Sequence, residues 1–166
     1  MEMDPAGQRV TDTGTAGVAI RPPLLFLGAL LIGFVLERLL RLPSPAWGDD
    51  LTYWIIGGSL ILIGLALAAA GIRNFSRRGT PVQSVKPTRA LVTTGIHGWT
   101  RNPIYLGMFL LYAGIGVAAQ SPWILILTVP LAITIRFGVV AREEAYLERR
   151  FGDAFREYRA RVRRWW

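Results

Sequence analysis

Two polar stretches lie at the edges of apolar segments, and their residue types are suited to binding or catalysis. The first combines a cation with a helix-starting proline and reads Thr100-Arg101-Asn102-Pro103-Ile104-Tyr105-Leu106-Gly107. The second holds adjacent carboxylates in Arg142-Glu143-Glu144. A helix start offers free N–H groups and the positive end of the helix dipole, so with Arg101 it suits a carboxylate ligand. The carboxylate pair suits a cation, an amine or ribose hydroxyls.

The order of residues in the first stretch favours a helix that begins at Pro103. Proline is tolerated in the first turn because its missing N–H would have no helical partner there. Asn102 then occupies the N-cap position, where asparagine is favoured. Tyr105 lies within the first turn, in reach of a ligand at the helix start. In the second stretch, neighbouring residues on a helix point about 100° apart, so one carboxylate faces a pocket while the other braces an adjacent element.

Two further residues are candidates for chemistry. Arg136 lies inside an apolar segment, about two helical turns before Glu143. Arginines at such positions pair with a carboxylate or face a cavity, and the sequence leaves both roles open for Arg136. His97 is the sole histidine; catalysis, ligand contact and a purely structural hydrogen bond all remain open for it.

The elements that position these residues are predicted to be membrane helices. The chain has 166 residues, of which 52% are hydrophobic, and its mean hydropathy is +0.36. Four apolar segments each approach the roughly 20 residues that cross a bilayer; they are 24–40, 51–72, 103–119 and 122–140. Pro130 is expected to kink the last one. The fold class is therefore an all-α integral membrane protein with about four transmembrane helices.

Charge predicts the orientation and the partners. The net charge is +8, and the segment 73–101 contains basic residues but no acidic one. The positive-inside rule then places both termini and the candidate site in the cytoplasm, in a plasma or inner membrane that we expect to be prokaryotic. Membrane lipids rather than nucleic acid are the expected partners, because the charges flank apolar spans. The polar residues 1–19 are expected to form a disordered tail.

The last segment, from about residue 141, has the pattern of an amphipathic cytoplasmic helix. Apolar residues recur every three or four positions; they are Leu147, Phe151, Phe155, Tyr158, Val162 and Trp165. Gly152 is expected to interrupt this helix so that its second half folds back as a lid. Trp165 and Trp166 suit a headgroup anchor at the membrane surface. The absence of cysteine and the single histidine exclude thiolate and multi-histidine metal sites.

Taken together, the motifs resemble those of the superfamily of isoprenylcysteine carboxyl methyltransferases and phospholipid methyltransferases, which are integral membrane enzymes. The resemblance covers roughly residues 79–165. It is carried by Leu91-Val92-x-x-Gly95-x-His97-x-x-x-Arg101-Asn102-Pro103-x-Tyr105-x-Gly107 and by Glu143-Glu144-x-x-Leu147-x-x-x-Phe151-Gly152-x-x-Phe155-x-x-Tyr158-x-x-x-Val162. It implies S-adenosyl-L-methionine bound on the cytoplasmic side under a C-terminal lid, with the substrate entering from the bilayer.

The resemblance also implies roles for individual residues. The implied cofactor-binding residues are Leu91, Val92, His97, Arg101, Asn102, Pro103, Tyr105, Glu143 and Glu144, and the candidate catalytic residues are Arg136 and Glu144. His97 stands where the family pattern has a tyrosine or phenylalanine. Val139 stands where carboxyl-methylating members carry an arginine. This departure argues against a prenylcysteine carboxylate as the substrate.

The sequence thus predicts a membrane-embedded S-adenosylmethionine-dependent methyltransferase that acts on a lipid or other apolar acceptor. Its single domain would span residues 20–166, with the cofactor-binding half at about 79–166. Two alternatives remain open. One is an NADPH-dependent membrane reductase related to sterol reductases, and the other is a non-catalytic scaffold or lipid-binding protein. Neither the chemical class of the acceptor nor the oligomeric state follows from the sequence.

Overall fold

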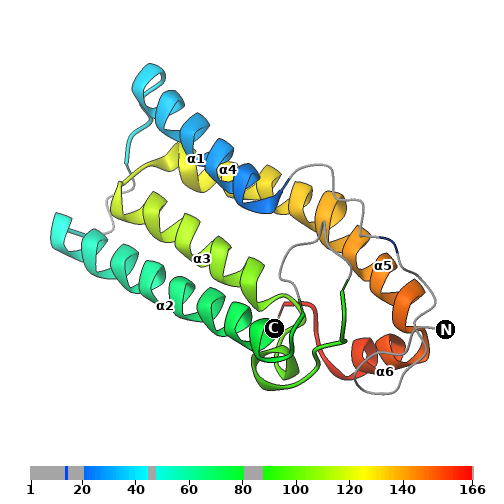
Figure 1. Cartoon of the computed structure of the whole chain (residues 1–166). Helices are drawn as coiled ribbons and strands as arrows, with labels where there is room; N and C mark the ends of the chain where they lie inside the picture. The colour runs from blue at the N-terminus through cyan, green and yellow to red at the C-terminus, as the bar shows by residue number, and fades with distance from the viewer. Residues whose placement is uncertain (1–13, 15–20, 45–47, 81–87, 166) are drawn as a thin grey trace. The chain divides into compact units, whose positions relative to one another are not determined.

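The computed structural model describes residue 14 and residues 21–44, 48–80 and 88–165 (Figure 1). Within these ranges the chain is helical and contains no β-strand, which confirms the all-α prediction. The expected disordered tail of residues 1–19 and the expected anchor Trp166 fall outside the described residues, apart from Gly14. The same holds for most of the loop around Pro81 and Lys86.

Eight helical elements follow one another along the described chain. Four come before the polar C-terminal part: α1 (Pro22–Leu39), α2 (Asp50–Arg77), the 3-10 helix η1 (Gly95–Gly98) and α3 (Pro103–Ala118). The other four are α4 (Pro122–Ile133), the π-helix η2 (Thr134–Val140), α5 (Ala141–Phe151) and α6 (Asp153–Arg161). The start of α3 at Pro103 confirms the predicted helix start.

Among the residues that the structure describes, three helices are long and apolar enough to cross a membrane: Pro22–Leu39, Asp50–Arg77 and the continuous run Pro122–Phe151. The fourth apolar helix, α3, has 16 residues. At 1.5 Å per residue it is about 24 Å long, less than the roughly 30 Å of a hydrocarbon core. It begins at Pro103 and ends before Gln120, which takes a positive φ of 49° at the turn into α4. The chain is therefore an integral membrane protein with three full-length candidate spans and one shorter apolar helix.

The last span is longer than its apolar residues predict. Helix continues from Pro122 through α4, η2 and α5 to Phe151, whereas the apolar pattern ends at Val140. Pro130 lies inside α4, and the switch to π-helical hydrogen bonding begins four residues later. A proline removes one helical N–H donor, and such sites tolerate local changes of helix type. Hydropathy alone did not detect this continuation, because the residues that follow Val140 are charged.

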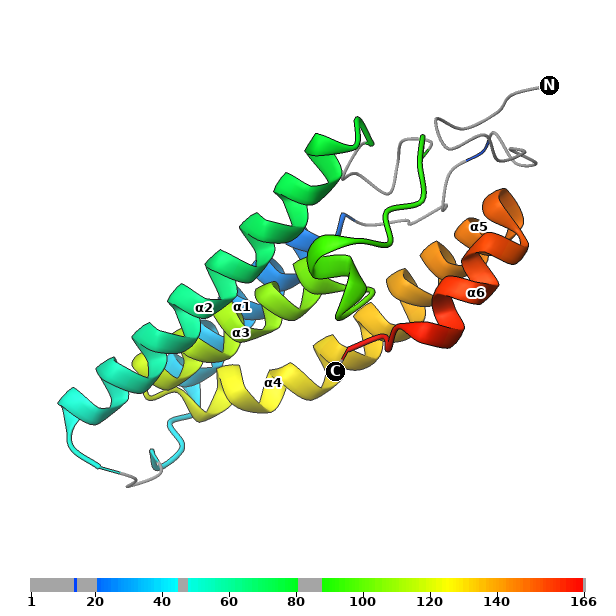
Figure 2. The ribbon, with the colours of Figure 1, turned by 90° about the horizontal axis from the view of Figure 1, so that it is seen from below.

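The described residues form two compact units. Unit 2 comprises residues 20–68 and 105–135, and unit 1 comprises residues 69–104 and 136–166, in each case as far as they are described. In unit 2, α1 runs along α4, and α2 runs along α3 (Figures 1 and 2). The single domain expected at residues 20–166 stays a prediction.

Glycines allow α2 and α3 to approach closely in unit 2. A Cβ on Gly57 would lie 2.7 Å from the carbonyl oxygen of Gly114, and one on Gly64 would lie 2.6 Å from that of Gly107. Two such contacts, seven residues apart on each helix, bring the backbones together. Small residues serve this purpose in lipid, where helices gain little from hydrophobic association.

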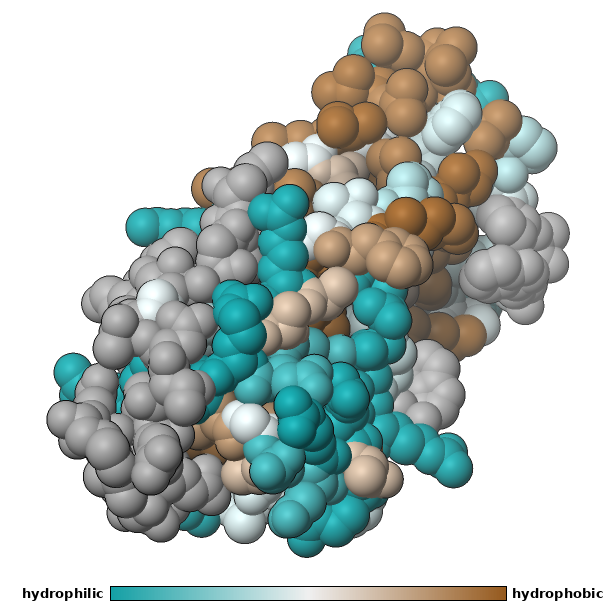
Figure 3. Space-filling view, turned by 90° about the vertical axis from the view of Figure 1, so that its right-hand side faces the viewer, coloured by the Kyte–Doolittle hydropathy of each residue, from teal (hydrophilic) through white to brown (hydrophobic). Residues whose placement is uncertain are grey.

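Unit 1 has a small apolar core built by its C-terminal helices. Phe151, Phe155, Tyr158 and Val162 are buried together, and Leu91 and Leu147 pack against them. Helix α5 ends at Phe151, Gly152 follows with a φ of +56°, and α6 turns back beside α5 (Figure 2). This geometry confirms the amphipathic pattern and the interruption at Gly152. Hydrophilic residues gather where α5 and α6 face the viewer in Figure 3.

Candidate functional site

Arg101 is the centre of a polar cluster in unit 1. Its Nη2 donates to Glu144 Oε1 at 2.8 Å, although the two residues lie 43 positions apart. Its Nη1 donates to the carbonyl oxygens of Val162 and Arg159, at 2.8 and 3.0 Å. The structure therefore brings together the two motifs that the sequence singled out, and it ties both to the C-terminal segment.

Glu144 is held from a second side by Arg164. The Arg164 guanidinium donates to Oε1 from Nε at 2.9 Å and to Oε2 from Nη2 at 2.6 Å. A planar guanidinium matches a carboxylate in this two-point geometry. The Glu144 side chain is 13% exposed. Both of its oxygens are thus occupied by guanidinium groups, which makes this carboxylate a poor proton acceptor.

Three consecutive motif residues hold the backbone after α6. Thr100 Oγ1 donates to the Arg164 carbonyl at 2.9 Å, and Asn102 Nδ2 donates to the same oxygen at 3.2 Å. Between them, the Arg101 backbone N–H donates to the Arg163 carbonyl at 3.0 Å. The segment that the resemblance assigns to a lid is therefore fastened to the motif by side chains and backbone together.

His97 is one of the most buried candidate residues. It is 2% exposed, and burial lowers the pKa of its imidazole to about 4. Its Nδ1 lies 2.9 Å from Asn74 Nδ2, and the Phe75 ring packs edge-on with 4.6 Å between centroids. The Tyr158 hydroxyl donates to the His97 carbonyl at 2.7 Å. Burial raises the pKa of that phenol, so Tyr158 remains a protonated donor.

The remaining candidates differ in their placement. Val92 is buried, and Leu91 joins the apolar core of unit 1. Glu143 is half-buried, one residue before Glu144. Tyr105 is half-buried in the first turn of α3 and belongs to unit 2, whereas Pro103 belongs to unit 1 and is fully buried. The cofactor roles of these residues stay predictions.

Arg136 is not part of the Glu144 cluster. It lies half-buried in η2, and its guanidinium carbon sits 5.0 Å from the centre of the Phe137 ring. The carboxylate oxygens of Glu144 are bound by Arg101 and Arg164 instead. Val139, on the next turn, is 2% exposed. Arg136 thus stays a candidate for contact with an anionic group of a substrate.

A second charged cluster joins α5 to α6. Glu148 accepts from Arg156 Nε at 3.0 Å and from Arg159 Nη1 at 2.9 Å. Its side chain is 30% exposed, and those of Arg156 and Arg159 are 58% and 45% exposed. This cluster resembles the Glu144 cluster in composition but is open to solvent.

Two buried nitrogen atoms of the motif region have no hydrogen-bond partner in the described part of the chain: His97 Nε2 and Arg101 Nε. Buried polar groups in folded proteins nearly always have partners. Donors left over in a cluster fit an acceptor-rich ligand such as a nucleoside with a carboxylate. In the described ranges, no three histidine, cysteine, aspartate or glutamate residues are arranged to hold a metal ion.

The phospholipid methyltransferase family model matches residues 52–154, more than half of the chain. The chain belongs to the phospholipid methyltransferase family. This confirms the resemblance identified from the motifs and indicates a membrane methyltransferase; it gives no support to the reductase alternative.

The phospholipid methyltransferase match spans both units and includes the Arg101 and Glu144 motifs. A shorter similarity links the chain to an uncharacterized protein of Haemophilus influenzae, with 62% identity over 26 residues. That stretch is 16% of this chain and 41% of the Haemophilus protein. The chain thus covers less than half of that relative's length.

Sequence reasoning missed three residues of the site. Arg164 is one of eight arginines after Val140, and nothing in their spacing marks it as the partner of Glu144. Thr100 lies in the first polar stretch, but its residue type alone gives no signal of a role in the site. Asn74 lies 23 residues before His97. Its one detectable signal is a polar amide at the end of an otherwise apolar helix.

Proposed function

We propose that this chain is a membrane-embedded methyltransferase that binds S-adenosyl-L-methionine in unit 1 and methylates a lipid or other apolar acceptor. The observation that carries the proposal is the direct contact between Arg101 and Glu144, which joins both family motifs in one cluster. Membership of the phospholipid methyltransferase family supports the reaction class. The carboxyl-methylating type has less support, because Val139 replaces its arginine.

The residues present fit the cofactor. Its carboxylate suits Arg101 and the start of α3, and its adenosyl group suits the unpaired N–H of His97 and the apolar side chains of Leu91 and Val92. When bound, this cofactor supplies a methyl group already activated on a sulfonium. The protein therefore has to hold, orient and dehydrate the reactants, and positioning alone provides a large share of such a rate enhancement.

Glu144 is suited to positioning rather than to proton transfer. Arg101 and Arg164 occupy both of its oxygens, and these contacts fix the motif against the C-terminal segment. An amine, phenol or thiol acceptor requires a base, and Glu143 is the other carboxylate of the pair. A carboxylate acceptor requires no base and would be oriented by Arg136.

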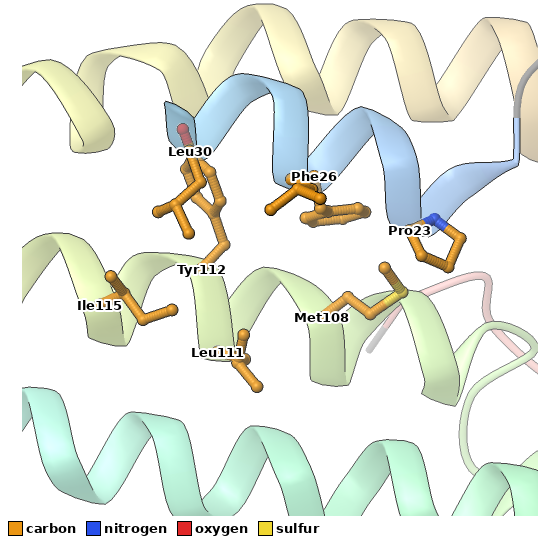
Figure 4. Close-up of a pocket in the computed structure, with 8 residues that line it drawn as sticks. Pro23, Phe26, Leu30, Met108, Leu111, Tyr112 and Ile115 are labelled. Atoms are coloured by element: carbon orange, nitrogen blue, oxygen red, sulfur yellow. The ribbon is translucent and has the colours of Figure 1, made fainter. Parts of the chain in front are cut away.

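An apolar acceptor is supported by a cavity within unit 2. It has a volume of about 220 Å³ and is lined by Pro23, Phe26, Leu27, Leu30, Met108, Leu111, Tyr112 and Ile115. Figure 4 shows α1 and α3 supplying the two walls, with the Tyr112 ring extending from α3 towards α1. No charged side chain lines this cavity. Such a lining suits an alkyl or isoprenoid chain.

Methyl transfer is tested with the purified chain, native membrane lipids and methyl-labelled S-adenosylmethionine. We expect label in the fraction extracted into organic solvent, and mass spectrometry of that fraction identifies the acceptor. Arg101→Gln is expected to abolish incorporation, whereas Arg156→Gln, in the exposed cluster, keeps it. Equal incorporation by both variants, or none by the wild-type chain across lipid extracts, overturns the proposal.

A cytoplasmic site is part of the proposal and rests on the basic residues near the end of α2. Because the chain has no cysteine, single cysteines report topology directly. Gly48→Cys and Ser76→Cys place thiols at exposed positions near opposite ends of α2. We expect a membrane-impermeant maleimide added to intact cells to label position 48 but not position 76. The reverse pattern contradicts a cytoplasmic site.

A further inference from the structure

Asn74, near the end of α2, fixes the chemical state of His97. Its side-chain Nδ2 lies 2.6 Å from the Thr94 carbonyl oxygen and 2.9 Å from His97 Nδ1. A carbonyl oxygen only accepts hydrogen bonds, so the Asn74 atom that faces Thr94 must be the NH₂ group. That group has two hydrogens. One serves Thr94, and the other is directed at the imidazole.

Since His97 Nδ1 accepts this hydrogen bond, it cannot carry a proton. A neutral imidazole has one N–H, and here it must be on Nε2. That atom is buried and has no hydrogen-bond partner among the described residues. The ring as a whole is 2% exposed, so water does not replace the missing partner freely. The result is a buried donor that awaits an acceptor.

The surrounding backbone holds the ring in this position. Gly95 has a φ of +61°, and a Cβ there would come within 3.2 Å of the Asn74 amide. Glycine at this position therefore permits both the turn and the close approach of Asn74. On the other side, the Tyr158 hydroxyl donates to the His97 carbonyl at 2.7 Å. The donor is fixed by contacts from two separate elements, α2 and α6.

We propose that Asn74 and His97 form a preset hydrogen-bond donor, in which Asn74 selects the Nε2–H tautomer and this N–H binds an acceptor nitrogen or oxygen of the cofactor. The identity of the ligand rests on the proposed function, whereas the tautomer does not. His97 is then a binding residue and not the base that removes a proton from the methyl acceptor. Asn74 is a positioning residue that acts through His97.

The low pKa of His97 agrees with this role. Burial holds the pKa at about 4, so the ring is neutral at pH 7. A neutral N–H donor suits an acceptor atom without selecting for its charge. Because Nε2–H only donates, it cannot bind the amino group of the cofactor. The possible acceptors are the adenine ring, the ribose oxygens and the carboxylate.

The experiment is nitrogen-15 NMR of the imidazole in detergent micelles. His97 is the sole histidine, so histidine labelled with nitrogen-15 gives one assigned ring. At pH 7 we expect Nδ1 to show the shift of an unprotonated ring nitrogen and Nε2 that of a protonated one. Saturating S-adenosylhomocysteine, with binding verified by calorimetry, should move the Nε2–H resonance. A protonated Nδ1 in the free protein overturns the tautomer.

Two variants sharpen the test. Asn74→Asp places a carboxylate beside Nδ1, which should draw a proton there and weaken S-adenosylhomocysteine binding roughly three- to tenfold, the cost of one hydrogen bond. Ser76→Ala, at an exposed position on the same helix, should change neither the protonation of Nδ1 nor the affinity for S-adenosylhomocysteine. If Asn74→Asp does not fold, the wild-type spectrum still decides the tautomer.

The outcomes separate this inference from the proposed function. Binding of S-adenosylhomocysteine with an unchanged Nε2–H overturns the donor role but leaves the function intact. Lack of S-adenosylhomocysteine binding overturns both the proposed function and the part of this inference that concerns the cofactor. The tautomer assignment is then still judged by the spectrum of the free protein.

Discussion

Unit 1 holds charged side chains against backbone carbonyls, whereas unit 2 brings helix backbones together at glycines. In unit 1, one carboxylate and two guanidinium groups connect residues 43 positions apart. In unit 2, the backbones approach closely where Gly57 faces Gly114 and where Gly64 faces Gly107. Changes of charge or pH should therefore alter the stability of unit 1, whereas changes of side-chain volume should alter the stability of unit 2. Chemistry is therefore expected from unit 1 and apolar binding from unit 2.

Two charged clusters within unit 1 also differ, in this case in their burial. Glu144 and Glu148 lie one turn apart on α5, and each is bound by two arginines. Glu144 is 13% exposed and Glu148 is 30% exposed. Solvent weakens exposed ion pairs, whereas the loss of one partner from a buried pair leaves an uncompensated charge. The two sites therefore form a matched test of burial.

The largest effect on stability is expected at Glu144. Replacing it by alanine leaves Arg101 and Arg164 without their carboxylate and should lower the free energy of unfolding by about 3 kcal/mol. Glu148→Ala should cost much less, because solvent weakens the ion pairs of this exposed carboxylate. Denaturant unfolding in detergent measures both. Equal losses would show that burial does not separate the two clusters.

The next effect depends on pH and concerns His97. Its pKa is about 4 in the folded chain and about 6.5 when unfolded. The unfolded chain therefore binds the proton first, so stability is complete above pH 6.5 and falls as the pH drops towards 4. Between pH 7 and pH 5 the loss is about 2 kcal/mol. His97→Phe should flatten this slope, and an unchanged slope would show that other groups cause it.

Volume rather than charge should control unit 2. Gly64→Ala would place a Cβ 2.6 Å from the Gly107 carbonyl oxygen and should cost about 1–3 kcal/mol, because the helices must separate. Gly58→Ala, on the same helix, meets no atom within 4 Å and should be neutral or slightly stabilising. Thermal unfolding in detergent distinguishes the two variants. Similar melting temperatures would show that the close approach at Gly64 does not control the stability of unit 2.

A smaller effect is expected where a polar residue caps a helix of unit 2. Ser121 accepts from the Ile124 N–H at the start of α4 and donates to Glu37 at 2.8 Å. Ser121→Ala should cost about 1 kcal/mol. Thr128→Ala removes only a bond from a side chain to the carbonyl one turn earlier and should cost less. A larger loss at Thr128 would contradict this ranking.

The sequence predicted the local features of both units well. Pro103 at a helix start, the apolar stripe of the C-terminal helices and the interruption at Gly152 all depend on neighbouring residues, and the structure confirms them. The motif pair also identified the family, because its spacing is specific.

The features that were missed depend on tertiary contacts. Arg164 cannot be told from its neighbouring arginines until the chain after α6 returns to Thr100 and Glu144. Asn74 gains its role only when η1 brings His97 to the end of α2. The continuation of the last span to Phe151 depends on charged residues that find partners, which a hydropathy pattern does not reveal.

The most direct test of the account is S-adenosylhomocysteine binding by calorimetry in detergent. The wild-type chain and Glu148→Ala should bind with similar affinity, and Glu144→Ala should not bind, because Arg101 and the C-terminal segment lose their common partner. Unfolding curves measured on the same samples verify that each variant is folded. Lack of binding by the wild-type chain, or equal binding by a folded Glu144→Ala, would contradict the assignment of unit 1 as the cofactor site.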